Sequence, residues 1–219
     1  MILKQKFRPL PMTPAPLLPR LIVATRNRHK TAEIRSLIGP RFEVLDATDF
    51  PDFPEVEETG TTFLENATLK AVAISRLVAG WVMADDSGLE VDALGGAPGV
   101  WSSSFGGEEG NHARNNARLA VAMQGQTVRS ARFRCTIVLA RTGVAEADFC
   151  GVVEGAITAA AAGAGGFGYD PLFVPTGYDR TFAELGESVK NAVSHRARAL
   201  AQAVEWLDQL KEEHTPNRP

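Results

Sequence analysis

The chain has 219 residues, 44% of them hydrophobic and 22% charged, with a formal net charge of −3 at pH 7. This is ordinary for a globular protein of one large or two small domains. The weakly negative net charge argues against binding to a nucleic acid polymer. No apolar run approaches the roughly 20 residues that are needed to cross a bilayer. Cys135 and Cys150 are the two cysteines, too few for a disulfide framework, so we expect a cytoplasmic protein without nucleic acid or membrane partners.

Residues 1–19 contain five prolines. Proline interrupts helices and central strands, so we predict that this segment is an extension outside the fold. Residues 20–210 are predicted to form the folded domain, and residues 211–219 a frayed tail.

Short apolar runs alternate with helical periodicity in the first half of the domain. Gly39-Pro40 ends the first helix, and Thr61 or Thr62 is placed to cap the second. The predicted elements, in order, are strand 21–24, helix 31–38, strand 42–45, helix 62–78 and strand 82–84.

The second half contains an alternating strand, with apolar residues at every second position from Phe133 to Leu139. We expect it to be half-exposed and the segment 149–157 to return antiparallel to it. Helices are predicted from Gly110 through Met123 and over 189–210. Strands that alternate with helices, together with this antiparallel pair, predict an α/β fold with a mixed β-sheet and flanking helices.

Six polar residues, from Thr25 through Arg26, Asn27, Arg28 and His29 to Lys30, separate the first strand from its helix. The amino end of a helix favours an anion through its free N–H groups and dipole, so the segment predicts a phosphate site. It lacks the glycines of a Walker A loop. A solvated polar turn is the alternative.

Asp85 and Asp86 directly follow the third apolar run. Ligands bind beyond the carboxyl ends of strands in open α/β sheets, and Mg²⁺ takes one or two carboxylates while substrate phosphate and water supply the rest. Glu57 and Glu58 provide further carboxylates on a loop. The alternative is an Asx-type turn before Gly88.

Two further segments carry groups that could contact a ligand. The glycine-rich stretch from Gly165 to Pro171 brings backbone and aromatic rings near a flat base, although a structural hairpin explains it equally well. The stretch from Lys190 to Arg196 gathers four donor-capable side chains, as either a ligand clamp or a solvated helix start.

Five motifs resemble, in order and spacing, the noncanonical purine NTP pyrophosphatase family, also called inosine triphosphate pyrophosphatases or XTP/dITP diphosphatases. They are Thr25-x-Asn27-x-x-Lys30, Glu58-Thr-Gly-x-Thr-Phe-x-x-Asn66-Ala, Ala84-Asp-Asp-Ser-Gly-Leu-x-Val-Asp92-x-Leu-Gly-Gly-Ala-Pro-Gly99, Gly166-Phe-Gly-Tyr-Asp-Pro171 and Lys190-x4-His195-Arg196. Three features depart from the family pattern: Arg26 where many relatives have Gly, no basic residue near Ser104, and the proline-rich extension.

The resemblance implies an elongated two-lobed fold with the substrate cleft between the lobes, a homodimer and Mg²⁺. It assigns the triphosphate to residues 25–30, and makes Asp86 the catalytic base and, with Glu58, a metal ligand. Ser87 is implied to touch the substrate. The implied base pocket consists of Phe167, Gly168, Tyr169, Asp170, Lys190, His195 and Arg196.

The resemblance also implies hydrolysis of ITP, dITP and XTP to the monophosphate and pyrophosphate, which would cleanse the nucleotide pool. The residues also leave open a nucleotide-binding sensor module, or a phosphatase for another phosphorylated metabolite. Neither a Cys–His nor a Ser–His pair is placed for covalent catalysis.

Overall fold

The computed structural model describes residues 18–213, with side chains for residues 18–210. The predicted tail lies outside the described residues from position 214 onward, and the predicted extension does so at residues 1–17. Pro19, the last residue of the predicted extension, contacts the sheet: its carbonyl accepts the N–H of Glu43 at 3.0 Å. Within the described part of the chain, no helix has the length and apolar character that a membrane crossing requires.

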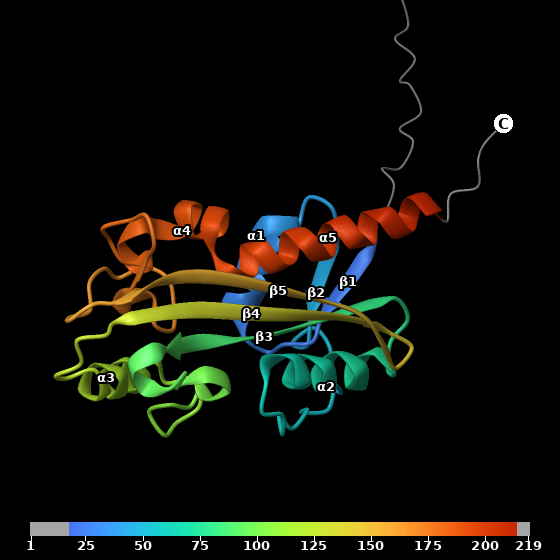
Figure 1. Cartoon of the computed structure of the whole chain (residues 1–219). Coiled ribbons are helices and arrows are strands. Elements are labelled where there is room, and N and C mark those ends of the chain that lie inside the picture. The colour runs from blue at the N-terminus through green and yellow to red at the C-terminus, as the bar shows by residue number, and fades with distance from the viewer. Residues whose placement is uncertain (1–17, 214–219) are drawn as a thin grey trace, which may run out of the picture.

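One six-stranded sheet in the order β2-β1-β3-β4-β5-β6 organises the chain (Figure 1). Strand β1 is parallel to β2 and β3, whereas β3, β4, β5 and β6 are antiparallel to one another in turn. This confirms the predicted α/β fold with a mixed sheet. The strands are β1 Arg20–Val23, β2 Glu43–Asp46, β3 Trp81–Val91, β4 Ser130–Arg141, β5 Val144–Ile157 and β6 Phe173–Pro175.

Helices cover both faces of this sheet. In Figure 1, α5 runs along one face of β4 and β5 and α2 lies under the other, while α3 and α4 lie at the far end. Thr62, one of the two predicted caps, forms a capping box with Glu65 at the start of α2. Asn27 caps α1, which therefore begins at Arg28 and not at the predicted Thr31. The helices are α1 Arg28–Ile38, α2 Phe63–Ser75, α3 His112–Ala122, α4 Phe182–Val193 and α5 His195–Glu213.

The core consists of three apolar clusters. One lies between the sheet, α1 and α5, one between the sheet and α2, and the third at the far end, where α3 and α4 pack. Because helices cover both faces of the second half of β4, every residue from Cys135 to Ala140 is buried. The predicted half-exposed strand at 132–139 is therefore wrong for this half and holds only near Arg132 and Arg134.

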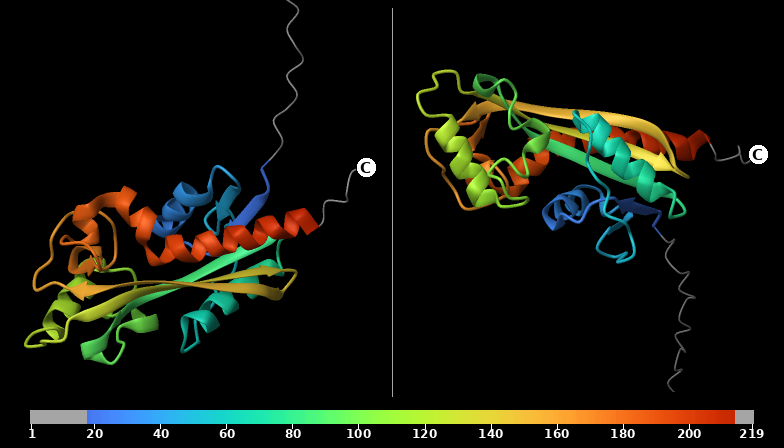
Figure 2. Two further views of the ribbon diagram at one scale, coloured as in Figure 1. Left: turned by 45° about the horizontal axis from the view of Figure 1, so that its top comes forward. Right: turned by 90° about the horizontal axis from the view of Figure 1, so that it is seen from below.

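Strand β3 is longer than the predicted strand at 82–84, which is wrong at its carboxyl end. It continues to Val91 because β4 supplies antiparallel partners from Val82 onward. On its other side, β1 ends opposite Met83. From Asp85 onward β3 therefore has a strand neighbour on one side only, and the second view of Figure 2 shows α1 and β1 set apart from this part of the sheet.

The predicted single helix over 189–210 is also wrong, because the chain breaks at Ser194. Its extended backbone ends α4, with its N–H donating to the carbonyl of Lys190. Its hydroxyl accepts the N–H of Ala197 at 3.2 Å and so caps α5. The break places Lys190, His195 and Arg196 at the junction of two helices.

We predict that Gly151→Ala destabilises this junction. A Cβ at Gly151 would overlap the carbonyl oxygen of His195 and lie 2.7 Å from the amide nitrogen of Ala199. Forced overpacking typically lowers the free energy of unfolding by about 1–3 kcal/mol. Urea denaturation measures it, with Asp148→Ala as the exposed control on the same strand, expected within about 0.5 kcal/mol of wild type. A Gly151→Ala protein as stable as the control would contradict the close packing of α5 on β5.

Candidate active site

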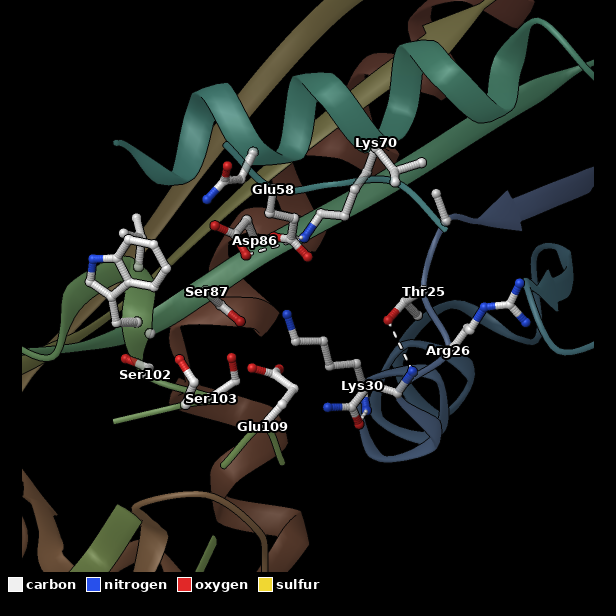
Figure 3. A pocket seen from close by; sticks show the side chains of 18 of the residues that line it. Thr25, Arg26, Lys30, Glu58, Lys70, Asp86, Ser87, Ser102, Ser103 and Glu109 are labelled. Carbon is white, nitrogen blue, oxygen red and sulfur yellow. Dashed lines mark hydrogen bonds and ion pairs between the residues drawn. The ribbon is translucent and has the colours of Figure 1, made fainter. Parts of the chain in front are cut away.

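A cavity of about 820 Å³ lies where β1 ends and β3 continues without a strand neighbour on that side. It is shown from close by in Figure 3. Most of the predicted site residues line it: Thr25, Arg26, Asn27, Lys30, Glu58, Asp86, Ser87, Phe167, Tyr169, Asp170, Lys190, His195 and Arg196. Arg28, His29 and Gly168 were also predicted to bind substrate, but they are not among the lining residues.

Asp85 and Asp86 point to opposite faces of the sheet, because successive side chains of a strand alternate. Asp85 lies on the face that α1 and α5 cover, where it contacts Arg196, and Asp86 lies on the face of α2, where it contacts Lys70. The alternative interpretation, an Asx-type turn before Gly88, is wrong, since both acids lie within β3. The two adjacent carboxylates thus have separate environments.

The Asp85 carboxylate is completely buried among cations. Its Oδ1 is 2.5 Å from Nζ of Lys30, and its Oδ2 is 3.0 Å from Nε of Arg196. The thiol of Cys135 donates to Oδ2 at 2.8 Å. Burial alone would raise the pKa of Asp85, but Arg196 and Lys30 outweigh it and hold that pKa well below the usual range. Asp85 is thus a buried anion at neutral pH, and it does not line the cavity.

Glu33 of α1 extends this buried network to α4. Its carboxylate accepts from Nζ of Lys190 at 2.7 Å and from Nη1 of Arg196. Lys190 also lies 2.6 Å from Oδ2 of Asp170. These ion pairs join α1, β3, the segment before β6 and both helices of the junction across the cleft.

Asp86 has the opposite electrostatic character. Its Oδ1 is 3.2 Å from Nζ of Lys70, while its Oδ2 is buried and has no hydrogen-bond partner among the described residues. Burial raises the pKa of Asp86, against the opposing charges of Lys70 and Lys30 and with the help of Glu58 and Asp85. An unpartnered buried carboxylate oxygen facing a cavity is suited to accept a proton or bind a cation.

Lys70 of α2 lies between two carboxylates. Its Nζ is 2.7 Å from Oε2 of Glu58 as well as 3.2 Å from Oδ1 of Asp86, and Figure 3 shows the three side chains converging. Glu57 also lines the cavity but shares no ion pair in the described structure. This contrast favours Glu58 as the acid near Asp86.

The amino end of α1 is less open to a phosphate than its sequence suggests. The side chain of Asn27 accepts from the N–H groups of His29 and Lys30 at 3.0 and 3.2 Å. Arg26 reaches away to the carbonyl of Phe53 at 2.7 Å. The polar groups that this segment presents to the cavity are therefore mainly the side chains of Thr25 and Lys30.

Aromatic rings and donors form the other end of the cavity. Nζ of Lys190 lies 4.3 Å from the ring centroid of Phe167, and the ring of His195 stacks on Phe133 at 4.9 Å. Burial and the nearby cations depress the pKa of His195 well below its usual value, so the imidazole is neutral, and its Nδ1 has no partner in the described structure. The buried Tyr169 also lines the cavity, and its hydroxyl donates to the carbonyl of Ser102 at 2.8 Å.

Arg196 was predicted to read the base, but its donors are already engaged. Nε and Nη2 contact Asp85, Nη1 contacts Glu33, and Nη2 also donates to the hydroxyl of Ser87 at 2.9 Å. The guanidinium therefore acts first as the counter-charge of two acids. Lys190 is likewise paired with Asp170 and Glu33.

Sequence reasoning missed Lys70 and Glu33. A signal existed for Lys70: it follows Asn66 by one helical turn and lies beside buried Ala67 and Ala71, so a cation was placed next to the apolar face of α2. Glu33 follows Lys30 by three residues on the same face of α1. Its two partners are more than 150 residues away, and no local pattern indicates them.

The residues present fit a Mg²⁺ site of the kind that relies on substrate. No group of three or more potential ligands exists among the described residues. Asp86 and Glu58 nevertheless place two carboxylates around one point, and Oδ2 of Asp86 is free to coordinate. Mg²⁺ typically uses one or two carboxylates together with phosphate oxygens and water.

We predict that Asp85→Asn lowers the free energy of unfolding by about 3–5 kcal/mol, because it leaves Arg196 buried without its main counter-charge. Asp86→Asn is the matched control in the next position, and we expect a much smaller change because burial already disfavours its charge. Chemical denaturation measures both variants. Equal stability losses would contradict the separate roles of the two acids.

Comparison with known proteins identifies the family. The sequence profile of the Ham1 family matches residues 21–206. The chain is 46% identical over 194 residues to the dITP/XTP pyrophosphatase of Desulforamulus reducens, covering 87% of this chain and 96% of that one, and 49% identical over 185 residues to that of Geobacter sulfurreducens, covering 83% and 93%. A HAM1 protein from Coxiella burnetii superposes with a TM-score of 0.79 at 36% identity, over 88% of this chain and 100% of the other. This chain therefore belongs to the Ham1 family.

Proposed function

We propose that residues 20–210 form a catalytic domain that hydrolyses ITP, dITP and XTP to the nucleoside monophosphate and pyrophosphate. The observation that carries the proposal is Asp86, a buried carboxylate with a raised pKa and a free oxygen, placed in a large cavity beside Lys30 and Lys70. The relatives from Desulforamulus reducens and Geobacter sulfurreducens, which are named dITP/XTP pyrophosphatases, support this substrate class.

In the proposed reaction a water attacks the α-phosphorus, the bond to the bridging oxygen of the β-phosphate breaks, and pyrophosphate leaves. Asp86 orients that water and accepts its proton; a raised carboxyl pKa makes it a stronger base. Lys30 and Lys70 neutralise charge on the phosphate oxygens, which dominates catalysis of phosphoryl transfer. Mg²⁺ bound by Asp86 and Glu58 would supply further charge neutralisation at the phosphates.

The base lies at the opposite end of the cavity in this proposal, with Phe167 as its stacking surface. Neutral His195 then offers a polar atom, Nδ1, which is otherwise unsatisfied. A hydrogen-bond donor placed for the 6-oxygen of hypoxanthine or xanthine would face the 6-amino group of adenine, which is also a donor. The unpaired donors would strongly favour ITP and XTP over ATP. Arg196 and Lys190 fix the pocket through Asp85, Glu33 and Asp170.

Two other functions, a nucleotide sensor and a phosphatase for another metabolite, fit the site less well. A nucleotide-sensing module has no need of a free, buried carboxylate beside the phosphates. A phosphatase for another metabolite would release orthophosphate. We also propose that the enzyme is a cytoplasmic homodimer, as the family resemblance implies; light scattering in solution tests the dimer.

We expect ITP and Mg²⁺ to give IMP and pyrophosphate, with EDTA abolishing turnover, since phosphoryl transfer depends on charge neutralisation at the phosphates. Anion-exchange chromatography identifies the products, and a pyrophosphate-coupled assay gives the rate. ATP is the matched comparison and should react with a much lower kcat/KM. IDP and orthophosphate as first products would contradict the proposed reaction, and binding of ITP without turnover would indicate the sensor instead.

For Asp86→Asn we predict a fall in kcat of about 10²-fold or more with nucleotide affinity largely kept, because the change removes the base without altering shape. Lys30→Ala should instead raise KM, since it removes a phosphate-binding charge. Steady-state kinetics with ITP, together with binding of a non-hydrolysable analogue, separates the two effects. Near-normal kcat in Asp86→Asn would remove Asp86 from the role of base.

A further inference from the structure

We propose that Lys70 occupies the position of the divalent cation in the nucleotide-free protein and is displaced when the metal and nucleotide enter together. Lys70 is in this account a positioning residue: it holds Asp86 and Glu58 around one point until the metal takes over. The inference rests on the proposed hydrolase function only in that these two acids are taken as the metal ligands.

The geometry points to a shared position. Nζ of Lys70 is 2.7 Å from Oε2 of Glu58 and 3.2 Å from Oδ1 of Asp86, so a single cationic group bridges the two carboxylates. The ammonium reaches them from α2, whose capping box fixes the start of the helix. An ion bridging the same two carboxylates would have to lie close to this nitrogen.

Electrostatics makes the two cations exclusive. The Lys70 ammonium forms ion pairs with both carboxylates and is largely shielded from solvent, so it occupies the space between them as a positive charge. An ammonium and a divalent ion a few ångströms apart in a poorly solvated cavity repel each other strongly. The metal can therefore bind both acids only after Lys70 has moved.

The side chains of Glu58 and Lys70 can each contribute to this exchange, in different ways. The side chain of Glu58 is 42% exposed, on a loop, whereas that of Lys70 is only 12% exposed. A lysine stem is flexible and carries a compact charge, so its ammonium can transfer to a phosphate oxygen nearby. The nucleotide brings that new anionic partner, which makes metal entry favourable with nucleotide and unfavourable without it.

The test measures Mn²⁺ or Mg²⁺ binding to the nucleotide-free protein by isothermal titration calorimetry, and so does not depend on turnover. In Lys70→Met, which keeps an unbranched side chain one atom shorter and removes the charge, we expect the metal to bind about tenfold more tightly or better. Lys30→Met is the matched control: it removes the same charge from the same cavity, but its partner is Asp85. We expect it to change metal affinity by less than about threefold.

Unchanged or weaker metal binding in Lys70→Met, or an equal gain in Lys30→Met, would overturn the proposal. If Lys70→Met does not fold, Lys70→Gln, which keeps a polar head group, takes its place with the same expectation. Adding Glu58→Gln should abolish the gain, and a gain that survives it would contradict the bridge. A protein that shows the gain but does not turn over ITP would reject the proposed function and leave the exchange of cations supported.

Discussion

Asp85 and Arg196 form a fully buried ion pair where β3, α1 and α5 meet. A single buried charge would be strongly destabilising, so each group depends on the other and on the surrounding donors. Glu33 and Lys30 connect this pair to α1, and Lys190 connects it to α4. These buried ion pairs thus join α1, β3, α4 and α5 beside the cavity.

The reactive carboxylate follows from this arrangement. Strand alternation sends Asp86 to the face opposite Asp85, where a partly buried lysine and an exposed glutamate are its neighbours. Both carboxylates are buried, but two cations pair with Asp85 and keep it charged. Asp86 is paired more weakly, so burial raises its pKa, and one of its oxygens has no partner in the described structure. Two identical side chains in sequence thereby acquire different chemistry, one as a structural anion and the other as a candidate base.

Features of the fold and site that depend on local interactions could be predicted from the sequence. Features that depend on contacts between residues far apart in the chain could not. Thr62 caps α2 at one of the two predicted positions, because capping is a local interaction. The length of β3 could not be read from the sequence, since Asp85 to Val91 become a strand only through pairing with β4. Likewise, the motif ending in His195 and Arg196 indicated donors in the cleft, but not that Arg196 is taken up by Asp85 and Glu33.

We propose that Asp86 activates a water that attacks the α-phosphorus. Hydrolysis of ITP in water enriched in ¹⁸O tests this directly, because attack at the α- or β-phosphorus gives the same two products but places the label differently. Mass spectrometry of the products should find the label in IMP, with pyrophosphate unlabelled. Label in pyrophosphate instead would contradict the assigned site of attack and the placement of the nucleotide against Asp86.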